Sequence, residues 1–241
     1  VLDVGCGGGI LTEALEAGIA PHMLWHAPDS AAHPLVAKLA QAAEAAGGEV
    51  FITSTDILSK LSGKDNPGAV IGVYAEMPTT LQSLDRTTAG IWLVAERLRD
   101  PGNLGTILRT GDAVGAGGLI LIDDCTDPFS VEAVRASMGA IFTQKVAAAR
   151  WEDFIAWLRS GPGQLVGTSL NTETDYQEPR YEAPTFLLIG NESQGLPAPY
   201  EAECDLLVKM PMLGKADSLN AAIATAVMAY EVLNQRRGRT E

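Results

Sequence analysis

The chain has 241 residues, 46% of them hydrophobic and 20% charged, which is the composition of a folded globular protein rather than a disordered one. Its formal net charge of −13 argues against nucleic-acid binding over the whole surface, although a local basic patch can still hold RNA on an acidic body. No apolar run reaches the roughly 18 residues that suggest a membrane span and no signal peptide is visible, so we expect a cytoplasmic protein. The start at Val1 suggests that the natural N-terminus lies upstream.

The cysteines and histidines give no pattern typical of a metal or redox site. The cysteines are too far apart for a CxxC pair and are expected to be reduced thiols, and no cluster of cysteines or carboxylates accompanies the histidines. These residues are Cys6, Cys125, Cys204, His22, His26 and His33. We therefore expect no metal and place the histidines at the surface around a loop.

The first segment, Val1–Ile10, is rich in glycine and imitates the cofactor-binding turn of Rossmann-fold methyltransferases. In that fold a second strand ends in an acidic residue about 20 residues further on. Here the apolar stretch Met23–Trp25 runs into His26–Pro28, and Asp29 lies beyond the proline. A strand and turn that lead into a helix over residues 11–17 are the interpretation that we favour.

Residues 1–78 are predicted to form a small α/β domain, followed by a linker over residues 79–90, where polar and turn residues show no clear period. Helices are expected at 32–46 and 54–61 and strands at 50–52 and 70–75. Strands that alternate with helices indicate a largely parallel sheet.

Residues 91–241 repeat the alternation on a larger scale. The pattern predicts strands at 91–95, 119–122, 145–147, 164–168 and 186–189 and one beginning at 206, and helices at 104–114, 130–138, 151–159 and 219–236. The apolar strand that stops at Gly190 and the polar turn after it present backbone N–H groups at the carboxyl edge of an open α/β sheet, where ligands bind. The last helix is apolar on nearly all sides, so we predict that it faces its own sheet and a second subunit across a two-fold interface.

Three segments in order resemble the signature motifs of the SpoU/TrmH family of RNA ribose 2′-O-methyltransferases, within the SPOUT superfamily. They are Asn103–Thr110, Gly190–Gly195, and Met210–Met212 with Ser218–Asn220. Each motif alone is weak, but all three occur in order, each at the carboxyl edge of a strand or the entry of a helix. The similarity covers about residues 90–237.

The resemblance implies an α/β SPOUT domain over residues 91–241, with a mostly parallel sheet and a deep trefoil knot that general topology rules would not predict. It also implies an obligate homodimer with the active site near the subunit interface, and S-adenosylmethionine as methyl donor. Residues 1–78 resemble the N-terminal RNA substrate domain of many members, which is like ribosomal protein L30e. The segment Val1–Gly9 departs from the Val-Glu-Gly-like start that these domains usually have.

The resemblance implies the residues of the site as well. The loops that wrap the donor are expected to contribute Leu170, Ile189, Gly190, Asn191, Gly195, Met210, Pro211, Met212, Ser218 and Leu219. The polar positions that match the family's catalytic set are Asn103, Arg109, Glu192, Ser218 and Asn220, and RNA contacts are expected from Arg109, Arg135 and Ser137.

Arg109 is expected to anchor a phosphate and the reacting hydroxyl rather than act as a base, because an arginine is effectively always protonated. Loss of the hydroxyl proton would then be late, to water or to a phosphate oxygen. Glu192 is expected to order its loop and orient Asn103 or Arg109. Without the resemblance, Arg109 and Arg135 are solvated helix residues, Asn103 is a helix cap and Glu192 is a carboxylate at a helix start.

The sequence therefore predicts a methyltransferase that acts on the ribose 2′-hydroxyl of ribosomal or transfer RNA. Two alternatives stay open: a non-catalytic RNA-binding protein that keeps the SPOUT fold, and a Rossmann-type methyltransferase that uses Asp3–Gly9.

Overall fold

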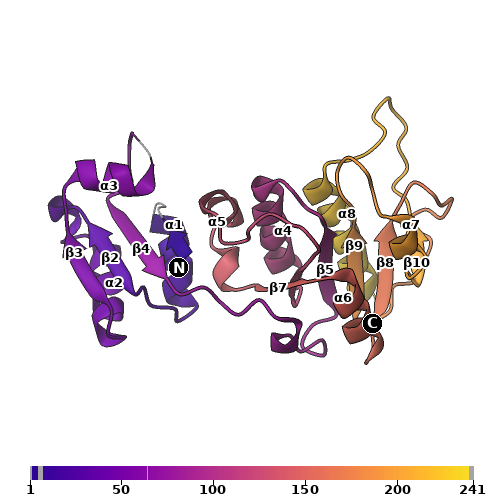
Figure 1. The fold of residues 1–241 in the computed structure, drawn as a ribbon, viewed down its shortest axis with the longest axis horizontal. Coiled ribbons are helices and arrows are strands. Elements are labelled where there is room, and N and C mark those ends of the chain that lie inside the picture. Colours follow the sequence, from indigo (N-terminus) through magenta and orange to yellow (C-terminus); the bar gives the residue numbers. More distant parts are fainter. Residues whose placement is uncertain (1, 5–7, 64, 239–241) are drawn as a thin grey trace.

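The computed structural model describes residues 2–4, 8–63 and 65–238. It contains two β-sheets, one of four strands that ends at Tyr74 and one of six strands that begins at Ile91. Figure 1 shows these sheets in two lobes that lie side by side along the long axis of the molecule. We call residues 2–74 the N-terminal lobe and residues 91–237 the C-terminal lobe.

The N-terminal lobe has a mixed sheet. Its elements are β1 (Leu2–Val4), α1 (Gly8–Glu16), β2 (Met23–His26), α2 (Pro34–Ala45), β3 (Glu49–Ile52), α3 (Thr55–Ser62) and β4 (Val70–Tyr74). In the order β1-β4-β2-β3, strands β2 and β3 are parallel and β4 is antiparallel to both β1 and β2. The prediction of a largely parallel sheet is thus wrong for this lobe. The short α3 does not carry the chain back across the sheet, so β4 begins at the edge where β3 ends.

Local capping signals set the helix ends in this lobe. The Ser54 hydroxyl accepts a hydrogen bond from Ile57 N at 3.4 Å and caps α3, as predicted. Gly63 ends that helix in the left-handed conformation, with φ of 63°. Helix α2 begins at Pro34, because proline suits the first helical position and His33 serves as the cap.

His26 does not lie at the surface, which corrects the expectation for the histidines. Its side chain is 4% exposed and Nδ1 lies 2.9 Å from the Ala27 carbonyl oxygen. Alternation along β2 places His26 on the same face as Leu24, and α2 covers that face. No group of three or more histidine, cysteine or acidic residues within the described part of the chain could hold a metal ion.

The strand that precedes the glycine-rich segment does not lie where a Rossmann fold would place it. Strand β1 lies at the edge of its sheet and pairs antiparallel with β4, whereas the Rossmann turn follows a strand inside a parallel sheet. This topology contradicts the Rossmann alternative for Asp3–Gly9, although Gly5–Gly7 themselves lie outside the described residues. Cys125 and Cys204 are free thiols. None of the helices that the structure describes is long and apolar enough to cross a membrane.

The six strands of the C-terminal lobe are all parallel. Its elements are β5 (Ile91–Glu96), α4 (Pro101–Val114), β6 (Gly118–Ile122), α5 (Val131–Ser137), β7 (Lys145–Ala149), α6 (Trp151–Arg159), β8 (Gln164–Thr168), β9 (Thr185–Ile189), α7 (Ala198–Glu201), β10 (Leu206–Val208) and α8 (Ala221–Arg237). The strand order is β10-β8-β9-β5-β6-β7, and every neighbouring pair is parallel. The predicted mostly parallel sheet is confirmed, and the carboxyl ends of all six strands lie at one edge.

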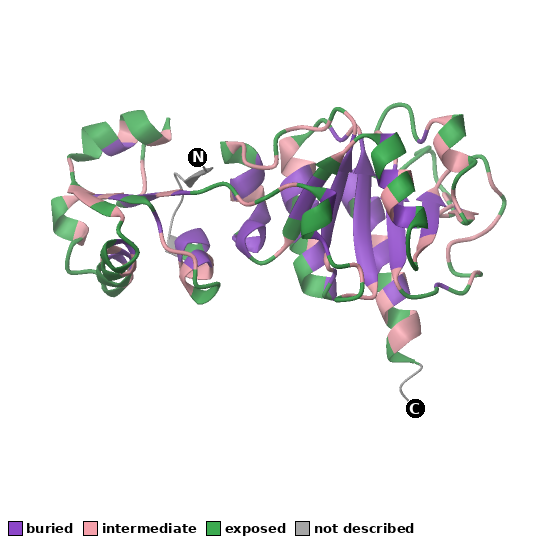
Figure 2. Ribbon diagram, turned by 60° about the horizontal axis from the view of Figure 1, so that its bottom comes forward, coloured by how far each residue is buried: buried purple, intermediate pink, exposed green. Residues whose placement is uncertain are grey.

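Helices cover both faces of this sheet. Strands β5, β6 and β9 are buried along their whole length, and Figure 2 shows the sheet in the colour of buried residues. In β5, Leu93 packs in the cluster formed with α4 and α8, whereas Trp92 and Val94 pack in the cluster formed with α6. Burial on both faces is typical of a parallel sheet.

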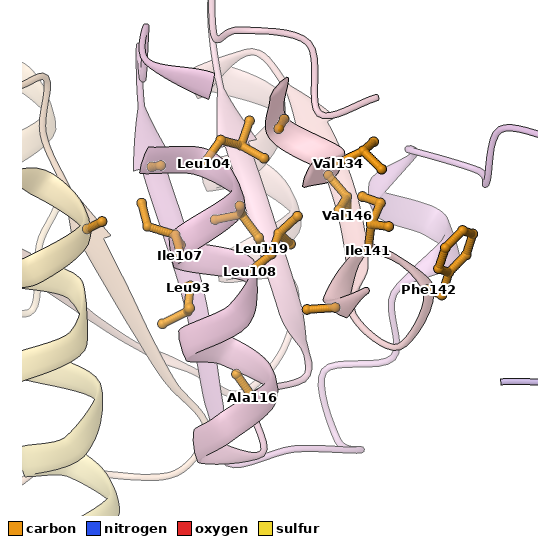
Figure 3. Close-up of a cluster of buried hydrophobic side chains, with 14 of the residues drawn as sticks. Leu93, Leu104, Ile107, Leu108, Ala116, Leu119, Val134, Ile141, Phe142 and Val146 are labelled. Carbon is orange, nitrogen blue, oxygen red and sulfur yellow. The ribbon is translucent and has the colours of Figure 1, made fainter. Parts of the chain in front are cut away.

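Helix α4 is packed tightly against its neighbours. Figure 3 shows Leu104, Ile107 and Leu108 on its buried side, facing the strands and α5. A Cβ at Gly105 would lie 2.4 Å from the Ala133 carbonyl oxygen, so only glycine permits this approach of α4 to α5. The helix starts at Pro101 with Asp100 as its cap, three residues before the predicted start. Its first turn is therefore held firmly in place at the carboxyl edge of the sheet.

Candidate active site

A cavity of about 500 Å³ lies at the carboxyl ends of β8, β9 and β10 and beside the start of α8. Figure 1 shows the long loops that follow these strands at that edge. The lining residues are Thr168, Ser169, Leu170, Asn171, Ile189, Gly190, Asn191, Glu192, Ser193, Gln194, Gly195, Leu196, Glu201, Val208, Lys209, Met210, Met212, Asp217, Ser218, Leu219, Ala221 and Ala224. Nearly all the residues predicted to bind the donor are among them. The exception is Pro211, which is exposed between two lining methionines.

Gly190 forms a close backbone crossing in the wall of the cavity. A Cβ at this position would lie 2.5 Å from the Gly195 carbonyl carbon and 2.6 Å from Leu196 N, which no side chain can accommodate without moving the loop. Gly195 N donates to the Asn191 carbonyl oxygen at 2.9 Å, and Gly195 has a φ of 66°. The two glycines therefore permit a tight turn directly after β9.

Asn191 organises the inside of that turn. Its Oδ1 accepts hydrogen bonds from Ser193 N at 3.0 Å and Gln194 N at 3.2 Å. An asparagine side chain commonly stabilises turns by bonding to the backbone in this way. The loop 190–195 is thus a compact, internally bonded structure.

Three polar side chains from the three sequence motifs meet beside the cavity. Asn103 Nδ2 donates to Glu192 Oε1 at 3.1 Å, and Asn220 Nδ2 donates to Asn103 Oδ1 at 2.9 Å. Asn220 also caps α8, because its Oδ1 accepts from Ala222 N at 2.9 Å and Ile223 N at 3.3 Å. The cap uses the oxygen of Asn220 and directs its amide nitrogen at Asn103, so the whole chain of bonds is oriented toward the Glu192 carboxylate.

The predicted cap role of Asn103 is not observed. Its backbone N–H donates to Asp100 Oδ1 at 2.6 Å, which makes Asp100 the cap and places Asn103 in the first turn. Its side chain is therefore available to join Glu192 and Asn220. Ser218 and Leu219 line the cavity just before this cap.

The predicted basic residues lie away from this cluster. Arg109 is exposed on α4 and is not among the described residues that line the cavity. Arg135 Nη2 donates to the Ser62 carbonyl oxygen at 3.3 Å, which ties α5 to the N-terminal lobe. Ser137 is 1% exposed and its hydroxyl donates to the Val134 carbonyl oxygen at 2.7 Å. Ser137 thus faces the protein core, because α5 packs that side against α4.

Sequence reasoning missed the polar group around Glu201 in the cavity wall, although Leu170 beside it was predicted. The Glu201 carboxylate accepts hydrogen bonds from the Ser169 hydroxyl and, at 3.1 Å, from Asn171 Nδ2. Ser169 directly follows a predicted strand, and that position was a usable signal. Glu201 gave none, because it lies in a helix of four residues.

Tyr200 anchors the short helix that carries Glu201. Its ring stacks on Trp151 with centroids 3.8 Å apart, and its hydroxyl donates to Asp123 Oδ2 at 2.7 Å. Burial, and secondarily the bond to Asp123, raises the pKa of Tyr200 above its ordinary value. The phenol therefore stays protonated as a donor, and Glu201 is held at the cavity wall.

The lining of the cavity carries net negative charge. Glu192, Glu201 and Asp217 contribute carboxylates, and Lys209 is the one lysine or arginine among the described lining residues. The Lys209 ammonium already pairs with Glu173 at 2.6 Å. Such a lining favours a ligand that carries positive charge.

Residues 90–230 match the model of the SpoU rRNA Methylase family. The chain belongs to this family. The match confirms the resemblance seen in the three motifs. The structure brings residues of the second and third motifs to one cavity and joins Asn103 of the first motif to Glu192 in its lining.

Relatives of this SpoU family chain are similar along most of its length. The AdoMet-bound rRNA methyltransferase from Sinorhizobium meliloti is 38% identical with a TM-score of 0.89, over 100% of this chain and 89% of that one. The 23S rRNA (uridine(2479)-2′-O)-methyltransferase of Streptomyces viridochromogenes is 34% identical over 80% of this chain and 70% of its own. The 23S rRNA (guanosine(2553)-2′-O)-methyltransferase RlmP of Bacillus subtilis is 30% identical over 77% and 73%.

Proposed function

We propose that the chain transfers a methyl group from S-adenosylmethionine to a ribose 2′-hydroxyl of RNA. One observation carries this proposal: Asn103, Glu192 and Asn220, from three separate family motifs, meet at one cavity. Two relatives are named as 23S rRNA 2′-O-methyltransferases, and the Sinorhizobium meliloti relative is described as bound to AdoMet. Ribosomal RNA is therefore the substrate class that we favour over transfer RNA.

The residues present fit the proposed donor. S-adenosylmethionine carries positive charge on its sulfonium and its ammonium group, and the acidic lining of the cavity suits both. The close crossing at Gly190 is possible only for glycine, and it places residues 190–195 together in the lining of the cavity, where their backbone groups can contact an adenosine group. We assign donor binding to the lining residues Leu170, Ile189, Gly190, Asn191, Gly195, Met210, Met212, Ser218 and Leu219, with Pro211 shaping the turn between the methionines.

The bound donor supplies an electrophilic methyl group, and the side chains of this chain position the hydroxyl that accepts it. Glu192 orders the loop and orients Asn103 through their hydrogen bond. Arg109 anchors a phosphate of the RNA rather than removing the hydroxyl proton, because a guanidinium is a hydrogen-bond donor with no acceptor site. That proton is released late, to water or to a phosphate oxygen.

We further propose a homodimer formed through α8. Helix α8 buries one side against α4 and β9, yet Ile223 is 54% exposed and Tyr230 52% exposed on the other side. Leu219 continues this apolar stripe to the rim of the cavity. A two-fold contact along the stripe would cover it and bring the subunit interface beside the site.

The remaining proposals concern the two lobes. We assign residues 1–78 to an L30e-like domain that binds the RNA substrate, residues 79–90 to a linker and residues 91–241 to the catalytic SPOUT domain. The trefoil knot is supported by the chain path, which leaves β9, forms β10 on the far side of β8 and returns so that α8 packs on β5 and β9. The free thiols of Cys125 and Cys204 fit a reducing cytoplasm.

The test is incubation with labelled S-adenosylmethionine and unmodified total RNA, followed by digestion to nucleosides. We expect label in 2′-O-methylnucleosides, and the labelled base would identify the nucleotide type. Label on a base would overturn the ribose chemistry. Absence of label from a protein that binds both the donor and RNA would favour the non-catalytic alternative.

A further inference from the structure

A buried carboxylate lies next to the loop 190–195, which lines the cavity. Glu96 is the last residue of β5 and is 1% exposed. Because Ala95 pairs with Ile189 in the register of β5 and β9, Glu96 lies next to the point where the chain leaves β9 at Gly190. A buried carboxylate is costly unless charged or hydrogen-bonding partners compensate it.

Both oxygens of Glu96 have partners. Oε1 accepts from Arg97 Nε at 2.5 Å, and Oε2 accepts from the backbone N–H of Asn191 at 3.3 Å. The first bond is an ion pair with the next residue in the chain. The second bond reaches the loop 190–195, so one side chain joins the end of β5 to the start of that loop.

Arg97 reaches the same loop at two further points. Its carbonyl oxygen accepts from Asn191 Nδ2 at 2.9 Å, and its Nη2 donates to Gln194 Oε1 at 2.8 Å. Arg97 has a φ of 43°, a left-handed conformation that is uncommon for a residue with a side chain. In this conformation both the carbonyl and the guanidinium of Arg97 contact the loop 190–195. Such local strain persists where surrounding bonds determine it.

Three hydrogen bonds thus run from two consecutive residues to Asn191 and Gln194. Asn191 in turn bonds to Ser193 N and Gln194 N inside the loop. Within this compact turn lies Glu192, which meets Asn103. The bonds from Glu96 and Arg97 therefore fix the position of the loop relative to β5 near both of its ends. The hydrogen bonds within the loop fix only its internal shape.

We propose that Glu96 and Arg97 are positioning residues that hold the loop 190–195 in the shape that lines the donor cavity and presents Glu192 to Asn103. The consequence of this inference, that the donor site is already formed before the donor binds, rests on the proposed function. A site that is already formed avoids the loss of affinity that follows when only a fraction of molecules is competent to bind.

The test uses the whole 241-residue chain with Glu96→Gln, Arg97→Lys and Arg97→Gly. Glu96→Gln keeps an acceptor for Asn191 N and removes the charge that holds Arg97. Arg97→Lys keeps a charge but loses the forked contact with Glu96 and Gln194. Arg97→Gly relieves the positive φ and removes the side chain altogether. The matched control is Asp124→Asn, which neutralises an 82% exposed carboxylate that pairs with Arg99 near the same edge.

Two quantities are measured in the absence of RNA: amide hydrogen exchange of residues 191–195 in the free protein, and the Kd for S-adenosylmethionine. We expect exchange in the loop to become faster, and the Kd to rise about tenfold if the competent loop falls to about one tenth of molecules. Exchange in β5 and β9 should stay slow in at least Arg97→Lys and Arg97→Gly. Asp124→Asn should match the unchanged protein in both quantities.

Unchanged loop exchange in all three variants would overturn the proposal, as would equal acceleration in the loop and in the core strands, which indicates a role in overall stability. If Arg97→Gly has the same loop exchange and the same Kd as the unchanged protein while the other two variants differ, the role assigned to the Arg97 side chain would be overturned. Failure of the proposed function is distinguishable, because the unchanged protein would then not bind S-adenosylmethionine, while hydrogen exchange would still report whether Glu96 and Arg97 order the loop.

Discussion

The two lobes differ in how deeply their strands are buried. In the C-terminal lobe β5, β6 and β9 are buried from end to end, whereas in the N-terminal lobe every residue of β3 is partly or fully exposed. The cavity and its polar cluster lie at the carboxyl edge of the deeply buried sheet. Chemistry that needs side chains placed within a fraction of an ångström is thus built on the more deeply buried of the two sheets.

The largest expected difference between the lobes is in how a glycine-to-alanine substitution in each affects binding of S-adenosylmethionine. A Cβ at Gly190 would meet the loop backbone at 2.5 Å, and a Cβ at Gly48 would meet the Pro21 carbonyl oxygen at 2.7 Å. We expect Gly190→Ala to weaken binding of S-adenosylmethionine and to slow methyl transfer by about a hundredfold, because a misplacement near 1 Å in a site can cost that much in rate. Gly48→Ala should destabilise the N-terminal lobe and leave donor binding intact. Isothermal titration and methyl-transfer assays of both variants check this.

A second pair of substitutions tests whether the lobes unfold separately. Leu187 in β9 and Leu24 in β2 are both 0% exposed, so truncation of either to alanine should cost about 2–5 kcal/mol of unfolding free energy. If the lobes unfold separately, calorimetry will show two transitions. We expect Leu187→Ala to lower the midpoint temperature of the transition that S-adenosylmethionine stabilises. Leu24→Ala should lower the midpoint temperature of the other transition only. A single transition that both variants shift equally would contradict the separation.

A smaller effect should come from the polar cluster of the C-terminal lobe. Asn103→Ala and Glu192→Gln, made singly and together, form a double-mutant cycle across their 3.1 Å hydrogen bond. We expect a coupling of about 1 kcal/mol in methyl-transfer rate, as is usual for side chains that act through one contact. Strictly additive effects would show that Glu192 does not orient Asn103.

The smallest effect concerns the pH dependence of the C-terminal lobe. Burial raises the pKa of the Cys125 thiol from 9.0 to about 11. Because folding favours the protonated thiol, this contribution to stability is complete below pH 9 and is lost as the pH rises toward 11. Urea unfolding at pH 8 and pH 10.5 should show a loss of stability that Cys125→Ala reduces. An equal loss in the variant would assign the effect to other groups.

Most of the C-terminal lobe could be predicted from the sequence, because its strands are short apolar runs between turn signals. β9 and α6 appear where periodicity placed them, and the cap positions explain the small shifts at the starts of α4 and α8. The sheet of the N-terminal lobe was misjudged, because alternation of strands and helices does not reveal whether a short helix such as α3 crosses the sheet.

The residues of the candidate site also fall into those that the sequence could predict and those that it could not. Glu192, Asn103 and Asn220 could be found because each lies in a local motif. The contacts of Glu96 and Arg97, on which we base their proposed positioning role, could not be found, because a carboxylate at the end of an apolar strand has no sequence signature and these contacts depend on a register that joins distant segments. Ser137, which was predicted to contact RNA, lies on the buried side of α5, since a motif position carries no information about which side of that helix faces the core.

The position of β5 in the sheet has a consequence for synthesis of the chain on the ribosome. β5 lies between β6, which follows it closely, and β9, which begins only at Thr185. While the chain emerges, β5 can pair with β6 long before its other edge finds a partner. Unpaired strand edges expose partly folded chains to association with one another. We therefore expect the nascent C-terminal lobe to need protection by chaperones until β9 has left the exit tunnel.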